Sequence, residues 1–120
     1  MLKLTIDQGN TTTKVALFKE EKLLQKISEV DFEDVLNYAK DADRVILSSV
    51  KSKSEYLNLS HSYFINLDSN TPLPIENRYS TPKTLGKDRI ALSVGAQHLF
   101  PGKDVLVLDM GSCLTYDFIN

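Results

Sequence analysis

Two segments of the chain place an acidic residue, a glycine and several hydroxyl residues directly after an apolar run. The first is Asp7-Gln8-Gly9-Asn10-Thr11-Thr12-Thr13-Lys14, and the second is Asp109-Met110-Gly111-Ser112-Cys113-Leu114-Thr115. Glycine in a turn lets the backbone approach a phosphate without a side-chain clash. Backbone N–H groups and hydroxyls can then donate hydrogen bonds to the phosphate oxygens. The aspartate that begins each segment can hold a cation that offsets the phosphate charge.

A plain hairpin is the alternative interpretation of either segment, because an aspartate often only caps its own turn. Two copies at corresponding strand ends are less expected by chance, and two such turns facing each other would hold one polyphosphate from both sides. Lys14 could neutralise phosphate charge, although alternation along the strand could turn it away. The candidate phosphate-binding residues are Asp7, Gln8, Gly9, Asn10, Thr11, Thr12, Thr13, Lys14 and Ser112.

A third segment, between these two, pairs a carboxylate with a guanidinium at Asp88 and Arg89. Asp88 could be the base for phosphoryl transfer, or it could be the N-cap of the helix that follows. A helix start stabilises a charged carboxylate and so weakens it as a base, but phosphoryl transfer depends more on orientation than on proton affinity. Arg89 could bind a carboxylate or phosphate as a fork, or lie on the helix surface. Tyr79 could line a substrate pocket or anchor the loop, and Gly86 could admit substrate or serve the turn.

Together the three segments resemble the type III pantothenate kinase family, within the acetate kinase, sugar kinase, Hsp70 and actin superfamily. The family's first phosphate motif, Asp-x-Gly-Asn-Thr, matches residues 7–11. Its pantothenate motif has Tyr, then Pro, then Leu-Gly-x-Asp-Arg, and matches residues 79, 82 and 85–89. Its second phosphate motif, Asp-x-Gly-Thr-x-x-Thr, matches residues 109–115, with Ser112 in place of the first threonine. Serine keeps the hydroxyl, so the departure is mild.

The resemblance implies ATP-dependent phosphorylation of pantothenate to 4'-phosphopantothenate, the first step of coenzyme A biosynthesis. It implies that Asp88 is the proton acceptor, that Asp109 binds a monovalent cation (K⁺ or NH₄⁺), and that Asp7 lies near the Mg²⁺ that accompanies ATP. The substrate-binding residues that it implies are Tyr79, Gly86, Lys87, Asp88 and Arg89. The family is dimeric, so we expect a homodimer with the helix from Arg89 at its interface.

Two functions of other classes remain as alternatives. One is a non-catalytic nucleotide-binding or regulatory module on the same fold, which would keep Asp7 and Asp109 but would not need Asp88. The other is a different kinase, or a phosphatase, of the superfamily. The Tyr79 to Arg89 motif argues against both.

Composition indicates an ordinary globular chain. Of the 120 residues, 42% are hydrophobic and 25% are charged, and the net charge is −2 without any Lys/Arg-rich block. A nucleic-acid surface is therefore not expected. No apolar run approaches a membrane span, and a strand starting near Met1 leaves no room for a signal peptide, so we expect a soluble cytoplasmic protein. Cys113 is the single cysteine; it forms no disulfide or zinc pattern, and we expect it to be a buried apolar residue.

The elements that position the first segment follow from apolar patterning. Residues 2–6 predict a central strand, 14–18 its hairpin partner, and 22–30 a third strand. Asp31 predicts the N-cap of a helix of about ten residues. A short buried strand is expected at 44–49, then a possible short helix within 51–59 and a strand at 62–66. Three strands, a helix and a strand are the opening order of a ribonuclease H-like half-domain.

The elements around the other two segments are a long loop, a helix and two strands. Residues 68–84 predict a functional loop. Residues 89–100 predict a helix that is apolar on nearly every face and therefore buried on every face. Strands are expected at 104–109 and 115–120. The fold class expected is α/β, a ribonuclease H-like (actin-like ATPase) domain with a mixed sheet and flanking helices. Residues 1–120 would form its N-terminal kinase half-domain, with the family's second domain absent from the chain.

Overall fold

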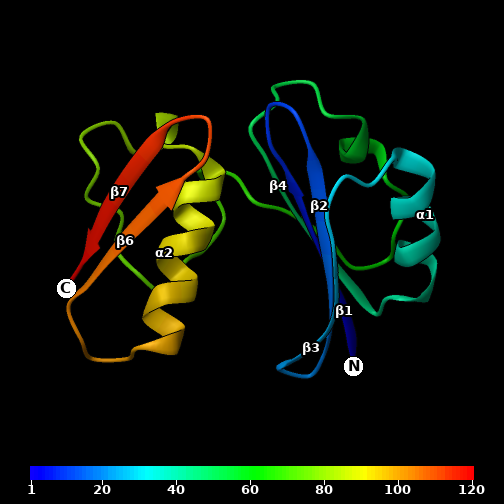
Figure 1. Ribbon diagram of the computed structural model, residues 1–120, viewed down its shortest axis with the longest axis horizontal. Helices are drawn as coiled ribbons and strands as arrows, with labels where there is room; N and C mark the ends of the chain where they lie inside the picture. The colour runs from blue at the N-terminus through cyan, green and yellow to red at the C-terminus, as the bar shows by residue number, and fades with distance from the viewer. The chain divides into compact units, whose positions relative to one another are not determined.

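A five-stranded mixed sheet occupies the first half of the chain in the computed structural model, which describes residues 1–120 (Figure 1). The spatial order is β3-β2-β1-β4-β5, so β1 is central as its apolar pattern predicts. β1, β2 and β3 are antiparallel neighbours, while β4 and β5 run parallel to β1. The strands are β1 (Leu2–Gln8), β2 (Thr13–Lys19), β3 (Lys22–Ile27), β4 (Arg44–Ser49) and β5 (Phe64–Asn66).

Helix α1 (Phe32–Asp41) covers one face of this sheet, where alternate strand residues are buried (Figure 1). Its N-cap is Asp31, whose carboxylate accepts a 2.9 Å hydrogen bond from the Asp34 N–H, so the predicted start of the helix is confirmed. A 3₁₀ turn, η1 (Glu55–Asn58), adds Tyr56 to the same core. The buried core residues are Leu4, Ile6, Val15, Val35, Ala39, Ala42, Val45, Leu47, Tyr56 and Leu59.

The third strand is shorter than its sequence suggests. It ends at Ile27, because Glu29 takes a left-handed conformation (φ 59°) that turns the chain out of the strand. The turn brings the Val30 N–H to the Thr13 carbonyl at 3.0 Å. β3 is an exposed edge strand, and its lysines suit an edge that must not pair with another chain.

The second half of the chain forms a smaller α/β unit. Contacts divide the chain into Met1–Asp68 and Ser69–Asn120. The second unit contains a 3₁₀ turn, η2 (Pro82–Thr84), helix α2 (Lys87–Leu99) and a hairpin of β6 (Val105–Met110) and β7 (Leu114–Ile119), with α2 packed on one face of the hairpin. With a mixed sheet and two α-helices, the α/β class is confirmed.

The single chain does not bury α2 on every face. Only Ile90 and Ser93 are buried in this helix, while Leu92 and Leu99 are 41% and 71% exposed. The hairpin is narrow, so it covers a single stripe of the helix. No atom lies within 4 Å of a Cβ placed on Gly95, so no backbone uses the small residue there as a close contact.

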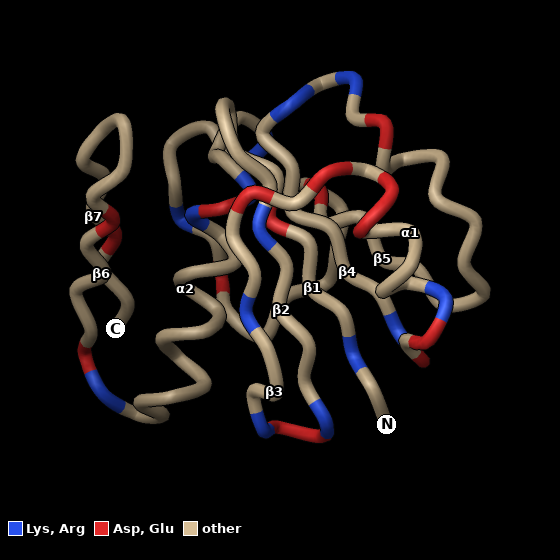
Figure 2. Tube along the Cα trace, turned by 45° about the vertical axis from the view of Figure 1, so that its right-hand side comes forward, with Lys and Arg blue, Asp and Glu red and all other residues tan.

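Charged residues are spread over the surface in both signs. Lysines and arginines lie interspersed with aspartates and glutamates along the trace (Figure 2). Neither helix has the length and the apolarity needed to cross a membrane.

Candidate active site

The first glycine turn joins β1 to β2. The Gly9 N–H donates a 3.0 Å hydrogen bond to the Thr12 carbonyl and closes the loop of residues 9–12. A Cβ at Gly9 would lie 3.4 Å from that same oxygen, so the loop is tight against residue 9. Asn10 and Thr11 are exposed at its tip, where their amide and hydroxyl groups face solvent.

Strand register places Lys14 beside Asp7. The two are directly opposite in the antiparallel β1–β2 pair, so their side chains project from the same face of the sheet. Both are exposed. The parallel neighbour β4 adds Ser48 opposite Asp7, and the Ser48 hydroxyl has no hydrogen-bond partner. A carboxylate, an ammonium and a hydroxyl therefore share one patch beside the first turn.

Gln8 points to the other face of the sheet and has a structural position. Its side chain is 1% exposed. The Ser49 hydroxyl donates to Gln8 Oε1 (2.7 Å), and Gln8 Nε2 donates to Glu55 Oε2 (3.2 Å). The pKa of Glu55 is lowered, first by a hydrogen bond from its own backbone N–H and then by the Gln8 amide. This network ties the end of β1 to β4 and η1 beneath the turn, so the Gln8 side chain is not directed at a ligand.

The second glycine turn, Gly111–Cys113, joins β6 to β7. The Gly111 N–H donates to the Cys113 carbonyl at 3.1 Å, and Ser112 is exposed at the tip. Asp109 and Thr115 are opposite each other across the hairpin and lie on its inner face, the face that α2 covers. The prediction that Cys113 is buried is wrong, because it lies in this tip and is exposed.

Asp88 lies in the first turn of α2 but does not cap it. The N-cap is Gly86, without a side-chain capping bond, so the capping interpretation of Asp88 is wrong. The Asp88 carboxylate instead accepts a 3.0 Å hydrogen bond from the Arg89 N–H. A Cβ on Gly86 would come within 2.6 Å of Asp88 Oδ1, so glycine here leaves the room that this carboxylate occupies. Both residues are half-buried, as is Lys87 at the first helical position.

Arg89 is held in a fork by a residue that the motifs did not indicate. Its Nε donates to Asp117 Oδ2 (3.0 Å), and its Nη2 donates to Asp117 Oδ1 (2.7 Å) and to the Tyr116 carbonyl (3.3 Å). The guanidinium carbon lies 5.4 Å from the centre of the Tyr79 ring, in a cation–π contact. The hydrogen bond to Asp117 raises the pKa of Arg89 above its ordinary value, so the guanidinium stays charged.

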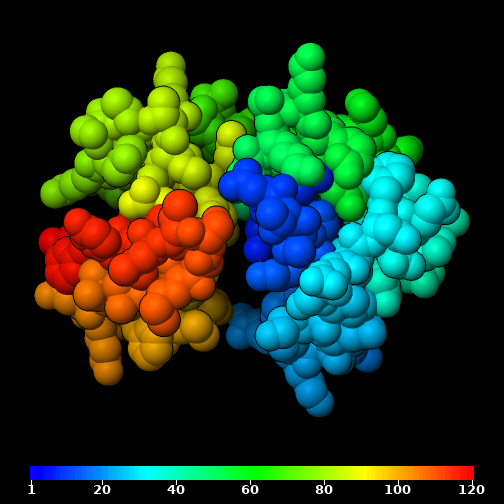
Figure 3. All heavy atoms as spheres, turned by 45° about the horizontal axis from the view of Figure 1, so that its top comes forward, coloured from blue at the N-terminus to red at the C-terminus, as the bar shows by residue number.

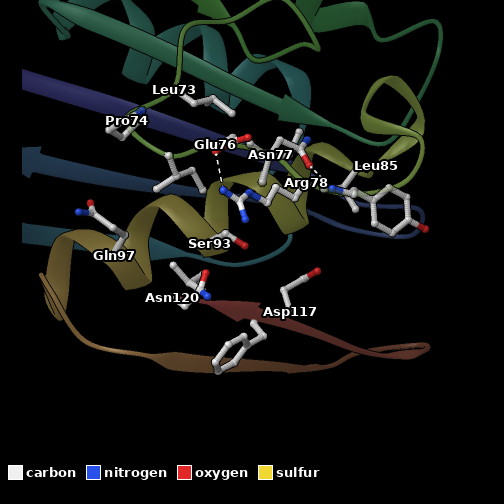
Figure 4. Close-up of a pocket in the computed structure, with 15 residues that line it drawn as sticks. Leu73, Pro74, Glu76, Asn77, Arg78, Leu85, Ser93, Gln97, Asp117 and Asn120 are labelled. Atoms are coloured by element: carbon white, nitrogen blue, oxygen red, sulfur yellow. Dashed lines mark hydrogen bonds and ion pairs between the residues drawn. The ribbon is translucent and has the colours of Figure 1, made fainter.

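A cavity of about 530 Å³ opens beside this pair, between loop 73–79, helix α2 and strand β7 (Figure 4). Asp117 projects from β7 toward α2, where Ser93 faces the strand. The wall of the cavity is mixed, with apolar side chains from the loop and the helix and polar side chains such as Asn77 and Gln97. A cavity of this size and polarity can take a small polar metabolite.

A cation at either aspartate would need oxygen ligands from outside the acidic side chains. No three His, Cys, Asp or Glu side chains form a cluster that could hold a metal ion. Asp7 has the neighbouring hydroxyl of Ser48, and Asp109 has that of Thr115. One carboxylate with hydroxyl, carbonyl and phosphate oxygens suits K⁺ or a Mg²⁺ that keeps several waters.

Comparison with known proteins assigns the chain to a family. The type III pantothenate kinase family model matches residues 3–120. The chain belongs to the type III pantothenate kinase family. The type III pantothenate kinase of Christiangramia forsetii is 44% identical over 97% of this chain, and that of Bacteroides fragilis is 39% identical over 99% of it. The chain spans about half the length of these relatives, 51% and 52%. The resemblance of the three motifs is thus confirmed as family membership.

In this chain of the type III pantothenate kinase family, sequence reasoning missed Asp117 and Ser48. A signal for Asp117 was available, because it interrupts an alternating strand on the face shared with Thr115 and Asp109. A charged residue on the covered face of a strand requires a partner. No comparable signal exists for Ser48, whose place beside Asp7 depends on a parallel pairing 41 residues away along the chain.

Proposed function

We propose that the protein containing this chain transfers the γ-phosphate of ATP to the primary hydroxyl of pantothenate, the first step of coenzyme A biosynthesis. The observation that supports this most is the match of the family model to residues 3–120. Members of the type III pantothenate kinase family are expected to carry out this chemistry, and the chain has the residues for it in three motifs. A cytoplasmic location is part of the proposal, because ATP is a cytoplasmic metabolite.

The nucleotide-binding residues that we propose in the first unit lie in and beside the first turn. Its backbone N–H groups, Asn10, Thr11 and Thr12 would donate to phosphate oxygens, and Lys14 would offset their charge. The shared sheet face of Asp7 and Lys14 supports this, because one phosphate-bound Mg²⁺ near Asp7 would leave Lys14 beside the same phosphates. Gly9 and Gln8 would act through the backbone. In the second unit, Ser112 would offer its hydroxyl to a phosphate oxygen.

The acceptor-binding residues that we propose in the second unit lie around the start of α2. Asp88 would accept the proton of the pantothenate hydroxyl, and Arg89 would bind the pantothenate carboxylate. Gly86 and Lys87 present backbone beside them, and Tyr79 borders both Arg89 and the cavity. Asp109 would hold a monovalent cation with Thr115, and Mg²⁺ would accompany ATP. The fork of Arg89 and the steric link between Gly86 and Asp88 support this assignment.

We propose further that residues 1–120 correspond to an N-terminal ribonuclease H-like kinase half-domain. The strand order β3-β2-β1-β4-β5, with an antiparallel meander followed by parallel strands, supports this. A homodimer through the exposed apolar residues of α2, including Leu92 and Leu99, is part of the same proposal.

The direct experiment is a coupled assay of ATP consumption with and without pantothenate, on a chain of the relatives' full length that carries these residues. We expect turnover that requires pantothenate and yields one ADP per phosphorylated product. ATP hydrolysis that ignores pantothenate would favour another enzyme of the superfamily. Nucleotide binding without turnover would favour a regulatory module.

Turnover should also depend on a monovalent cation. Replacing K⁺ by Na⁺ or by a bulky organic cation, at fixed ionic strength, should lower kcat by about tenfold or more, because a cation that offsets phosphate charge contributes at least about 1.4 kcal/mol. Asp109→Asn should lower activity in K⁺ and remove the difference between the cations. Asp104→Asn is the matched control, since Asp104 is an exposed residue just before β6 and should leave the dependence intact. Equal activity of the parent in all three cations would contradict the site.

A further inference from the structure

Arg89 is oriented by the strand opposite its helix. The Arg89 Nε and Nη2 groups donate hydrogen bonds to the Asp117 carboxylate, and Nη2 also donates to the Tyr116 carbonyl. The Tyr79 ring lies against the guanidinium. A fork of this kind allows one orientation of the plane, whereas a single contact would leave the side chain free to rotate. Arg89 is therefore placed before any ligand binds.

Asp117 has no evident purpose in packing. It sits between Thr115 and Ile119 on the inner face of β7 and is opposite Val107, where an apolar side chain would pack well against α2. The side chains of Arg89 and Asp117 are 23% and 18% exposed, so both charges lose much of their hydration. Pairs of this kind often contribute little to net stability, because desolvation offsets the attraction. A carboxylate at position 117 is better explained by the orientation that it gives to the Arg89 side chain.

The fork leaves donors for a second anion. A guanidinium carries five N–H groups, and Asp117 takes the edge formed by Nε and Nη2. The opposite end, with the Nη1 hydrogens, can still meet a carboxylate. Arg89 can then bind two carboxylates at once, that of Asp117 and that of a ligand.

We propose that Asp117 is a positioning residue that aims Arg89 at the carboxylate of the substrate. The proposal rests on the proposed function, because it takes Arg89 as the residue that recognises the pantothenate carboxylate. Asp117 touches neither the reacting hydroxyl nor the phosphate, and it acts only through Arg89. Its loss should therefore weaken recognition of the carboxylate and leave the ATP site unchanged.

The test uses two substrates that differ at the carboxylate. Pantothenate carries it, and pantothenyl alcohol has a neutral hydroxymethyl group in its place. In the full-length chain, Asp117→Asn keeps the size of the side chain but turns an amide N–H toward the Arg89 donors. We expect KM for pantothenate to rise about tenfold to a hundredfold, as small misplacements of a binding group do. KM for pantothenyl alcohol and for ATP should change less than about twofold.

Three further variants separate positioning from structural support. Asp117→Glu keeps the carboxylate and should restore part of the preference for pantothenate. Arg89→Met should remove the preference for pantothenate over pantothenyl alcohol. Adding Asp117→Asn to Arg89→Met should raise KM for pantothenate no further, because the two residues act as one unit. Glu20→Gln is the matched control, since Glu20 pairs with the N-terminal ammonium in the first unit and should not alter either KM.

The outcomes separate the proposed function from the role of Asp117. A parent chain that does not phosphorylate pantothenate overturns the proposed function, and this inference with it. If the parent chain phosphorylates pantothenate, the inference alone is overturned when Asp117→Asn raises KM for pantothenate and for pantothenyl alcohol equally. It is also overturned when the variant changes neither KM. A variant that binds pantothenate more tightly overturns it too, because Asp117 would then compete with the substrate for Arg89.

Discussion

Asp88→Asn in the full-length chain should lower kcat by about 10²–10⁴-fold while nucleotide binding survives, which corresponds to about 3–5 kcal/mol of barrier. The reason is that asparagine cannot accept the proton of the substrate hydroxyl. Asparagine has the same size, and its Oδ1 can still accept the hydrogen bond from the Arg89 N–H. The room left by Gly86 is also unchanged. The chemistry is thus removed with little effect on the start of α2.

The measurement is kcat from the coupled assay, together with the Kd of ATP by calorimetric titration and the thermal midpoint. Asp104→Asn, at an exposed site in the same unit, is the control for removing one negative charge. A near-normal kcat in Asp88→Asn would show that the base lies elsewhere. A large fall in thermal midpoint would show that Asp88 mainly supports the fold.

The 120-residue chain by itself should self-associate through the outer face of the β6–β7 hairpin. Alternate residues there are large, apolar and 57–82% exposed, which is unusual for a monomer's surface. Figure 3, in which the hairpin is orange to red, shows its atoms at the surface of the molecule. We expect a second copy to cover this face. The residues of the face are Leu106, Leu108, Met110, Leu114, Tyr116 and Phe118.

Leu108→Lys combined with Tyr116→Glu should weaken the association through this face by about two to four orders of magnitude. The two residues are directly opposite, so the new charges attract each other and the hairpin pairing is kept. Full burial of two large apolar side chains contributes about 3–6 kcal/mol, and each 1.4 kcal/mol is about tenfold in affinity. Light scattering across a concentration series is the measurement. Leu23→Glu with Leu24→Lys, on exposed β3, is the matched control; a monomeric parent chain would refute the prediction.

Short-range patterns in the sequence predicted the local elements. Asp31 and Asp34 are three residues apart, so a capping bond could be expected without knowledge of the fold, and the structure contains it. The β1–β2 hairpin followed from an apolar run on each side of a glycine turn. Elements without a strong local signal were less well predicted. β3 was expected to run to residue 30, and its end at Ile27 depends on one left-handed residue, Glu29.

Burial was harder to predict than secondary structure. Residues 89–100 contain enough apolar side chains for every face, yet exposure depends on how much surface the neighbours offer. A two-stranded hairpin covers one stripe of α2, so Leu99 and Phe100 stay exposed. The alternative interpretation of Asp88 as the N-cap is wrong, because its carboxylate lies beside Gly86 instead of capping the helix.

Residue spacing along the chain was enough to recognise the family, its three motifs and most of the local elements, because turns, caps and strands depend on residues a few positions apart. Which side chains meet over long separations depends on the folded chain. Arg89 and Asp117 are 28 residues apart, and Gln8 and Glu55 are 47 apart. Lys14 faces the same side as Asp7 because of strand register. Such pairs depend on how distant segments align, and a shift of one residue would turn each strand side chain to the opposite face.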